Sequence, residues 1–492
     1  MIEVHSKVQL TCLPSENPYL SGAWEPTDTE WNASGVGLQI IGELPKDLNG
    51  VYLRNGHNQV HAPIGKYHPF DGDGMVHAMH FRDGQVEYRN RFIRTTGFLA
   101  EAAAGESMWP GIIEPGKAVR RGWGSIGAMK DNAGTDIKVH AGRALVSMSQ
   151  CSEPYRMDPQ SLETLGPDPK WARALGDRGI CSHFKVDEGT GELMFFNFGE
   201  KAPYFNYGVV NAANELVHYE AIELPGPRWP HDLGMSKNYC VLHDLPMFFD
   251  EEGLRKGQHR LKFHRQLPAR FGVIPRMGTN RDVKWFEGEP CYILHLANCY
   301  EEGDEVVMDG CIQRNPVPDL SAYPREGYER MNAMSDQHLK QTRMHRWRFN
   351  LKTGQTREED LDDEVTEFPM INTQYAGQAY RYSYNAYMPP GGWFLDGLKK
   401  YDWLTGNTQS WRAPKGCYVS EAPFAARDGA TEEDDGYLVS FITNENTRKG
   451  ECAVFDAKDI EKGPVCRIIL PGHIPMGAHA CWAGASSLVA NA

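Results

Sequence analysis

The stretch FKVDEGTGELMFF at residues 184–196 contains the unit that decides the fold: a strand, a turn carrying Asp, and a second strand. Apolar residues alternate on both sides of the turn, as they do in half-buried strands. Asp and Gly occupy the turn because they tolerate the backbone conformations of tight hairpins. The stretch therefore predicts an antiparallel β-hairpin.

The same unit, with Asp or Asn in the turn, recurs along the chain. Further copies are YRMDPQSLETL (155–165), GVVNAANELVHYE (208–220), WRFNLKTGQTREE (347–359), KYDWLTGNTQSW (400–411) and AVFDAKDIEKGPVCRIIL (453–470). Repeated hairpins are typical of β-propellers, whose blades are small antiparallel sheets around an axis. The copies are irregularly spaced, so we expect insertions between blades. A β-sandwich or barrel with repeated hairpins is the alternative.

The composition is that of a globular protein with a sizeable core. The 492 residues are 41% hydrophobic and 24% charged, and 50 Gly and 31 Pro favour short strands joined by tight turns. A net charge of −14 argues against a nucleic-acid partner, because contacts with phosphates rely on clustered Lys and Arg. No Pro- or Ser-rich linker divides the chain. We expect one catalytic propeller domain over residues 35–492 and an N-terminal extension, 1–34, packed on it.

The features that bear on localisation point to the cytoplasm. The first ten residues, MIEVHSKVQL, lack a basic segment followed by an apolar one, so no secretion signal is expected. No window approaches the roughly 18 apolar residues of a membrane span. The eleven Cys include no Cys-x-x-Cys pair, which suits reduced thiols in the cytoplasm.

Four of the 18 His stand out because they lie in apolar contexts next to strand patterns. They are His183 (CSHFKVD), His231 (RWPHDLGM), His295 (YILHLANCYEE) and His479 (MGAHACW). Their wide separation fits metal ligands supplied by different blades, and it does not fit one helix. Neutral imidazoles would leave an Fe(II) ion its full charge and an open face for O₂. Each His taken alone is more often a packing residue than a ligand.

From Leu44 onward the chain resembles the carotenoid cleavage oxygenase family. The resemblance covers roughly residues 35–485, and its motifs occur in the family's order. They are LPKDLNGVYLRNG (44–56), HPFDGDGMVHAMHF (68–81), RFIRTTGF (91–98), HLANCYEE (295–302), EFPMINTQYAGQAYRY (367–382) and EAPFAAR (421–427). The resemblance implies an all-β, seven-bladed propeller with a helical and loop dome over one face. It also implies one axial Fe(II) per chain and cleavage of a carbon–carbon double bond with O₂ into two carbonyl products.

The resemblance assigns roles to individual residues. It makes His183, His231, His295 and His479 the iron ligands. Glu367 and Glu421 match two of the family's three glutamates that orient the ligand imidazoles. The third falls on Gln150, which accepts a hydrogen bond but carries no charge, with Glu153 nearby as the alternative. Thr135 matches a threonine near the vacant coordination position, and an ordinary turn residue is the other interpretation.

The substrate is expected to be an apolar polyene. Stilbene cleavers of the family place a Lys directly before the third glutamate, where it meets the substrate phenol, and here that position is Ser149. This favours a carotenoid or apocarotenoid over a stilbene or phenylpropene. Candidate substrate-facing residues, each also explained by core packing, are Phe70, Phe98, Leu294 and Phe368. A retinoid-type isomerohydrolase and a non-catalytic propeller binding module are minor alternatives.

The segment HDLPMFFDEEGLRKG (243–257) sets Met247, Phe248 and Phe249 beside charged residues. It predicts either a loop that touches a membrane to extract an apolar substrate or the end of a buried strand.

Overall fold

The computed structural model describes the chain except residues 13–16, 125–126, 250–251, 253–260, 325 and 489–492. Strands dominate the described part, and its helices are short: α1 (Thr96–Ala104), α2 (Ala172–Leu175) and α4 (Glu329–Ser335). The chain divides into two compact units, with Met1–Ser182 and Asp396–Ala492 in unit 1 and His183–Leu395 in unit 2. None of the described helices is long and apolar enough to cross a membrane.

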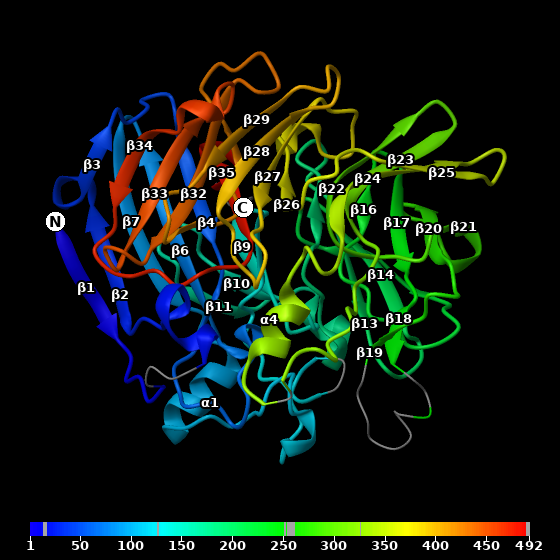
Figure 1. The fold of residues 1–492 in the computed structure, drawn as a ribbon, viewed down its shortest axis with the longest axis horizontal. Coiled ribbons are helices and arrows are strands. Elements are labelled where there is room, and N and C mark those ends of the chain that lie inside the picture. Colours follow the sequence, from blue (N-terminus) through cyan, green and yellow to red (C-terminus); the bar gives the residue numbers. More distant parts are fainter. Residues whose placement is uncertain (13–16, 125–126, 250–251, 253–260, 325, 489–492) are drawn as a thin grey trace. The chain divides into compact units, whose positions relative to one another are not determined.

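Unit 1 contains three sheets of four or more strands in its described residues (Figure 1). The first has the order β1 (Ile2–Lys7), β2 (Thr29–Ser34), β7 (Gln85–Phe92), β6 (Asp73–Arg82), β4 (Gly50–Arg54) and β35 (Ala480–Gly484), with β5 (His57–Asn58) paired to β6. The second is β11 (Thr164–Pro167), β10 (Tyr155–Met157), β9 (Arg143–Ser147) and β8 (Asp136–His140). The third is β3 (Gln39–Gly42), β34 (Pro464–Ile469), β33 (Lys449–Asp456), β32 (Gly436–Asn444) and β30 (Cys417–Val419), with β31 (Phe424–Ala426) paired to β32.

Both ends of the chain contribute to unit 1. The late strand β35 pairs antiparallel with the early strand β4 and so completes the first sheet. That sheet packs on β32–β34 (Figure 1) through one buried cluster that includes Tyr52, Met79, Tyr88, Phe441 and Val454. The pairing fixes the position of His479, which directly precedes β35.

Unit 2 also contains three four-stranded sheets in its described residues. They are β12 (Lys185–Val186), β13 (Leu193–Phe198), β14 (Phe205–Val210) and β15 (Leu216–Ile222); then β16 (Gly234–Met235), β17 (Tyr239–Asp244), β20 (Ala269–Pro275) and β21 (Lys284–Gly288); then β22 (Tyr292–Glu302), β23 (Glu305–Gln313), β24 (Thr342–Asn350) and β25 (Thr356–Asp360). A two-stranded sheet joins β18 (Met247–Phe249) to β19 (Leu261–Phe263). The core of this unit is a cluster around Phe271, Trp347 and Phe349.

All six hairpins predicted from the sequence are confirmed. Their strands pair antiparallel as β10–β11, β12–β13, β14–β15, β24–β25, β28 (Gly397–Asp402) with β29 (Thr408–Arg412), and β33–β34. The all-β, propeller-type class is confirmed with them.

The prediction of seven blades is wrong. Among the described residues, six sheets of four or more strands lie wholly within one unit, three in each. The strands that would make a seventh blade are divided between the units. The hairpin of β26 (Thr366–Met370) and β27 (Tyr382–Tyr387) belongs to unit 2, and the hairpin β28–β29 belongs to unit 1. The count of sheets within the two units is therefore six, and the number seven came from the family resemblance, since the repeated hairpins by themselves do not fix a number of blades.

Candidate metal centre

Three imidazoles supplied by different sheets of unit 2 converge on one point. His183 lies just before β12, His231 just before β16, and His295 within β22. Each offers one ligand nitrogen, and these three atoms lie within 4.8 Å of one another. Nε2 of His183 is 3.0 Å from Nε2 of His231. His183 and His295 are buried and His231 is half-buried. Clustered neutral imidazole nitrogens of this kind suit a divalent transition metal.

A buried carboxylate orients the ring of His295. Nδ1 of His295 lies 2.5 Å from Oε2 of Glu367, which is fully buried in β26. The same oxygen accepts a hydrogen bond of 2.6 Å from the backbone N–H of Phe368. A carboxylate on Nδ1 keeps the proton there and leaves Nε2 as the nitrogen that can bind a metal.

The backbone beside these residues adopts left-handed conformations that are unfavourable for side chains with a Cβ. The φ angle is +64° at His183 and +53° at Phe368. Such conformations persist only where the surroundings enforce them, and they are concentrated at functional sites. The Phe368 ring lies 4.7 Å from the His295 ring and 5.7 Å from Trp393, measured between centroids. Phe368 therefore packs between the His295 ring and Trp393.

The polar residues that follow His295 in β22 hold nearby loops in place. The side chain of Asn298 donates hydrogen bonds to the carbonyls of Tyr375 and Gln378 and accepts one from the N–H of Gly377. Glu301 accepts a hydrogen bond of 2.7 Å from the hydroxyl of Ser236. These contacts explain the Asn and the first Glu of the motif HLANCYEE.

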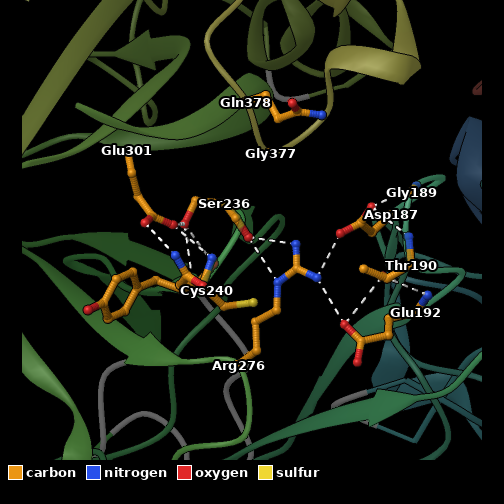
Figure 2. A network of polar contacts seen from close by, with 12 residues as sticks. Asp187, Gly189, Thr190, Glu192, Ser236, Cys240, Arg276, Glu301, Gly377 and Gln378 are labelled. Carbon is orange, nitrogen blue, oxygen red and sulfur yellow. Dashed lines mark hydrogen bonds and ion pairs between the residues drawn. The ribbon is translucent and has the colours of Figure 1, made fainter. Parts of the chain in front are cut away.

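Figure 2 shows how Arg276 joins two sheets of unit 2. Its Nη1 lies 2.7 Å from a carboxylate oxygen of Asp187 and 2.9 Å from one of Glu192. Its Nε and Nη2 donate to the carbonyl of Ser236 at 2.9 and 2.7 Å. The guanidinium is largely buried, so every contact replaces a lost water contact. The network thus fixes the sheet after His183 against the sheet after His231.

Unit 1 repeats the pairing of a histidine with a carboxylate. Nδ1 of His479 lies 3.2 Å from Oε1 of Glu421, and the other oxygen of Glu421 accepts from the N–H of Ala480 at 2.6 Å. Burial raises the pKa of the Glu421 carboxyl, but His479 and Lys138 outweigh it, so that this pKa lies below its usual value. Glu421 therefore stays ionised beside the imidazole.

Thr135 contacts both His479 and Ser149 in unit 1. The carbonyl of Thr135 accepts a hydrogen bond from the N–H of His479 at 3.1 Å, and its hydroxyl accepts one from the N–H of Ser149 at 3.2 Å. Gln150, the next residue, is buried. The carboxylate of Glu153, the alternative to Gln150, instead accepts from the hydroxyl of Tyr155 at 3.1 Å.

The apolar candidates fall in different environments. Phe70 is half-buried, with its ring 5.4 Å from that of His57. Phe98 belongs to a small core cluster with Phe92, and Leu294 packs against the core of unit 2. Of the four aromatic and aliphatic candidates, Phe368 is the one whose ring lies against a predicted ligand within the described residues of its unit.

His57 is a buried histidine of unit 1 that the sequence analysis did not single out. Its side chain is buried, and its Nε2 has no hydrogen-bond partner in the described part of the chain. Burial, helped by His68 and His479, lowers the pKa of this imidazole to about 3. The ring is therefore neutral at physiological pH. Its place directly after the motif LPKDLNGVYLRNG is the signal that could have identified it.

The segment predicted to touch a membrane is only partly described, since 250–251 and 253–257 lie outside the described residues. Met247 and Phe249 are buried in β18. Phe248 is half-buried, stacked on His264 at 3.8 Å between centroids, with Arg228 over its ring at 4.2 Å.

Comparisons with known proteins show which sequences and folds this chain resembles. The family model described as retinal pigment epithelial membrane protein matches residues 24–484. A carotenoid 9,10(9',10')-cleavage dioxygenase 1 of Pisum sativum is 31% identical, with 94% of this chain and 89% of that protein covered. The crystal structure of Pseudomonas brassicacearum lignostilbene dioxygenase has a TM-score of 0.82 at 26% identity and covers 95% of this chain and 98% of its own. A Synechocystis apocarotenoid oxygenase variant shares the fold, with a TM-score of 0.82 at 23% identity over 97% and 100% of the two chains.

Proposed function

This chain belongs to the carotenoid cleavage oxygenase family, and on that premise we propose that it is a non-haem Fe(II) dioxygenase that cleaves a double bond of a carotenoid or apocarotenoid. The reaction consumes O₂ and yields two carbonyl products. The observation that carries the proposal is the convergence of the ligand nitrogens of His183, His231 and His295 within 4.8 Å.

The residues present fit the proposed metal. His183, His231 and His295 would hold Fe(II), with His479 as the fourth ligand. The set is neutral, and the carboxylates of Glu367 and Glu421 lie on Nδ1 of two of its rings, as is usual for metal-binding imidazoles. When bound, Fe(II) supplies the activation of O₂ that double-bond cleavage requires.

The chain's own residues orient the ligands. Glu367 and Glu421 hold a proton on Nδ1 of His295 and His479, which keeps the opposite nitrogen available. Gln150 takes the place of the third glutamate, so the site carries one negative charge fewer. Thr135 would face O₂, and Phe368, which packs on His295, would line the path of an apolar substrate.

The substrate class follows from Ser149. This residue is buried, and its hydroxyl has no partner in the described part of the protein. An uncharged side chain here offers no cation to a substrate phenol, which favours a polyene. Cleavage of a stilbene is the second candidate, supported by the likeness to a lignostilbene dioxygenase at 26% identity.

Product analysis by mass spectrometry tests the substrate class. Fe(II)-loaded protein would be incubated in air with one C40 carotenoid, one apocarotenal and one hydroxystilbene in parallel. We expect paired aldehyde or ketone fragments from a polyene. Cleavage of the stilbene alone would reassign the enzyme to aromatic substrates.

Peripheral membrane contact through Met247, Phe248 and Phe249 stays a prediction, as does a cytoplasmic location. Phe248 is the most accessible of the three, so it is the residue to test. Changing Phe248 to Ser is expected to reduce co-sedimentation with liposomes, and unchanged binding would contradict the contact.

A further inference from the structure

The buried carboxylate of Asp232 contacts segments that carry all three convergent histidines. Asp232 directly follows His231 and is buried. Its Oδ1 lies 2.7 Å from Nζ of Lys185, two residues after His183. Its Oδ2 accepts a hydrogen bond of 2.9 Å from the N–H of Leu296, the residue after His295. One side chain therefore joins three chain segments that belong to three different sheets.

The contact with Leu296 occurs where β22 is irregular. The pairing of β22 with β23 shifts register between Ile293 and Leu296 and again between Leu296 and Asn298. Such bulges leave a residue out of the regular ladder and redirect a side chain. In β22 these register shifts flank Leu296, the residue after His295. Asp232 supplies the acceptor for the Leu296 amide. Gly310 lies opposite because a Cβ there would come within 2.9 Å of the His295 carbonyl oxygen.

We propose that Asp232 is a positioning residue that sets the spacing of His183, His231 and His295. The inference rests on the proposed metal function of these histidines. Asp232 acts differently from Glu367, because it bonds to the backbone and to a neighbouring lysine rather than to an imidazole. Ligands that come from three sheets must hold the metal-binding geometry to within about half an ångström, and a shared carboxylate provides that constraint.

Asp309 in β23 is a matched control for a purely structural role. It is also fully buried in unit 2, with its carboxylate 2.7 Å from Nε of Arg346 and 2.8 Å from the hydroxyl of Tyr380. None of these partners is within two residues of a predicted ligand. Truncating Asp309 removes a comparable buried ion pair and leaves the histidine-bearing segments connected.

The test compares Co(II) binding by Asp232→Ala, Asp232→Asn, Asp309→Ala and the full-length wild type, with Co(II) as the probe metal. The dissociation constant comes from chelator competition, the ligand geometry from the visible absorption of bound Co(II), and stability from the Tm of the metal-free protein. For Asp232→Ala we expect affinity to fall about 10- to 100-fold, with a changed spectrum. Asp232→Asn keeps an acceptor for Leu296 but loses the charge opposite Lys185, so we expect a fall of about tenfold.

Asp309→Ala is expected to lower the Tm and to leave the Co(II) affinity and spectrum unchanged. Wild-type affinity and spectrum in either Asp232 variant would overturn the inference, and Asp232→Asn decides the matter if Asp232→Ala does not fold. Failure of the wild type itself to bind Co(II) would overturn the proposed metal centre, and the inference with it.

Discussion

At the scale of single residues, the pair His295 and Glu367 defines the chemistry of the centre. The two residues are far apart in sequence, yet their side chains meet at 2.5 Å in a buried environment. A carboxylate in this position fixes both the tautomer and the orientation of its imidazole. The same logic applies to His479 and Glu421.

We predict that His295→Ala abolishes both metal binding and activity, because an open-sided site needs all of its ligands. Metal content by mass spectrometry and product formation measure the two effects. His218→Ala is a suitable control. His218 lies on the outer strand β15, where its ring is hydrogen-bonded to the Gly278 carbonyl, so this variant should retain both metal binding and activity. Full metal content in His295→Ala would refute its role as a ligand.

Gln150→Glu tests the proposed replacement of the family's third glutamate by Gln150. Restoring the charge is expected to leave the metal bound, because the added carboxylate offsets the metal's positive charge. Metal content and steady-state rates of the variant and the wild type give the comparison. Loss of the metal in Gln150→Glu would contradict the expected role of this residue in orienting a ligand.

At the scale of elements, the irregular strand β22 positions His295 only because Gly310 leaves room for it. A Cβ at residue 310 would lie 2.6 Å from Cδ2 of Leu296 and 2.9 Å from the carbonyl oxygen of His295. The backbone oxygen cannot move without moving the histidine.

We therefore predict that Gly310→Ala destabilises the protein by about 1–3 kcal/mol and weakens metal binding in the same variant. Thermal unfolding and metal titration measure these effects. Gly484→Ala is the control, since a Cβ at that position meets nothing within 4 Å. Equal Tm and metal affinity for Gly310→Ala and the wild type would show that β22 adapts freely.

The sequence predicted the hairpins well because their signals are local. Each of the six needs only alternating apolar residues around a turn with Asp, Asn or Gly, and all six formed. The count of seven blades, which came from the resemblance to a family, was wrong, because no local pattern encodes which hairpins share a sheet. The role of Asp232 could not be predicted for the same reason, because its partners Lys185 and Leu296 are close to it only after folding.

The site was predicted in part. Spacing and apolar context selected His183, His231 and His295, and the structure brings their nitrogens together. Glu367 was found only through resemblance to a family, because nothing in its neighbourhood points to His295. His57 was missed because its one distinguishing signal, its position directly after the motif LPKDLNGVYLRNG, does not show that its side chain is buried.

At the scale of the whole molecule, buried neutral histidines make stability depend on pH. His243 is buried in β17, and neither of its ring nitrogens has a partner among the described residues. Burial lowers its pKa to about 4. His243 takes up a proton near pH 6.5 in the unfolded chain, but only near pH 4 in the folded protein. Acidification through this window therefore favours unfolding.

We predict that the metal-free protein loses stability between pH 6.5 and pH 4, and that His243→Leu loses less. Each unit of pKa shift corresponds to about 1.4 kcal/mol of stability. The difference in stability loss between the wild type and His243→Leu is therefore measurable by thermal unfolding at several pH values. Parallel pH profiles for the wild type and the variant would show that His243 does not titrate as its burial indicates.

The central claim is that a histidine-bound iron in this protein cleaves a double bond with O₂. Its most direct test is the mass spectrum of products formed from an apocarotenal by Fe(II)-loaded protein in air and under argon. We predict paired carbonyl fragments in air and none under argon. Turnover that continues under argon, or intact substrate in both atmospheres with iron bound, would contradict the claim.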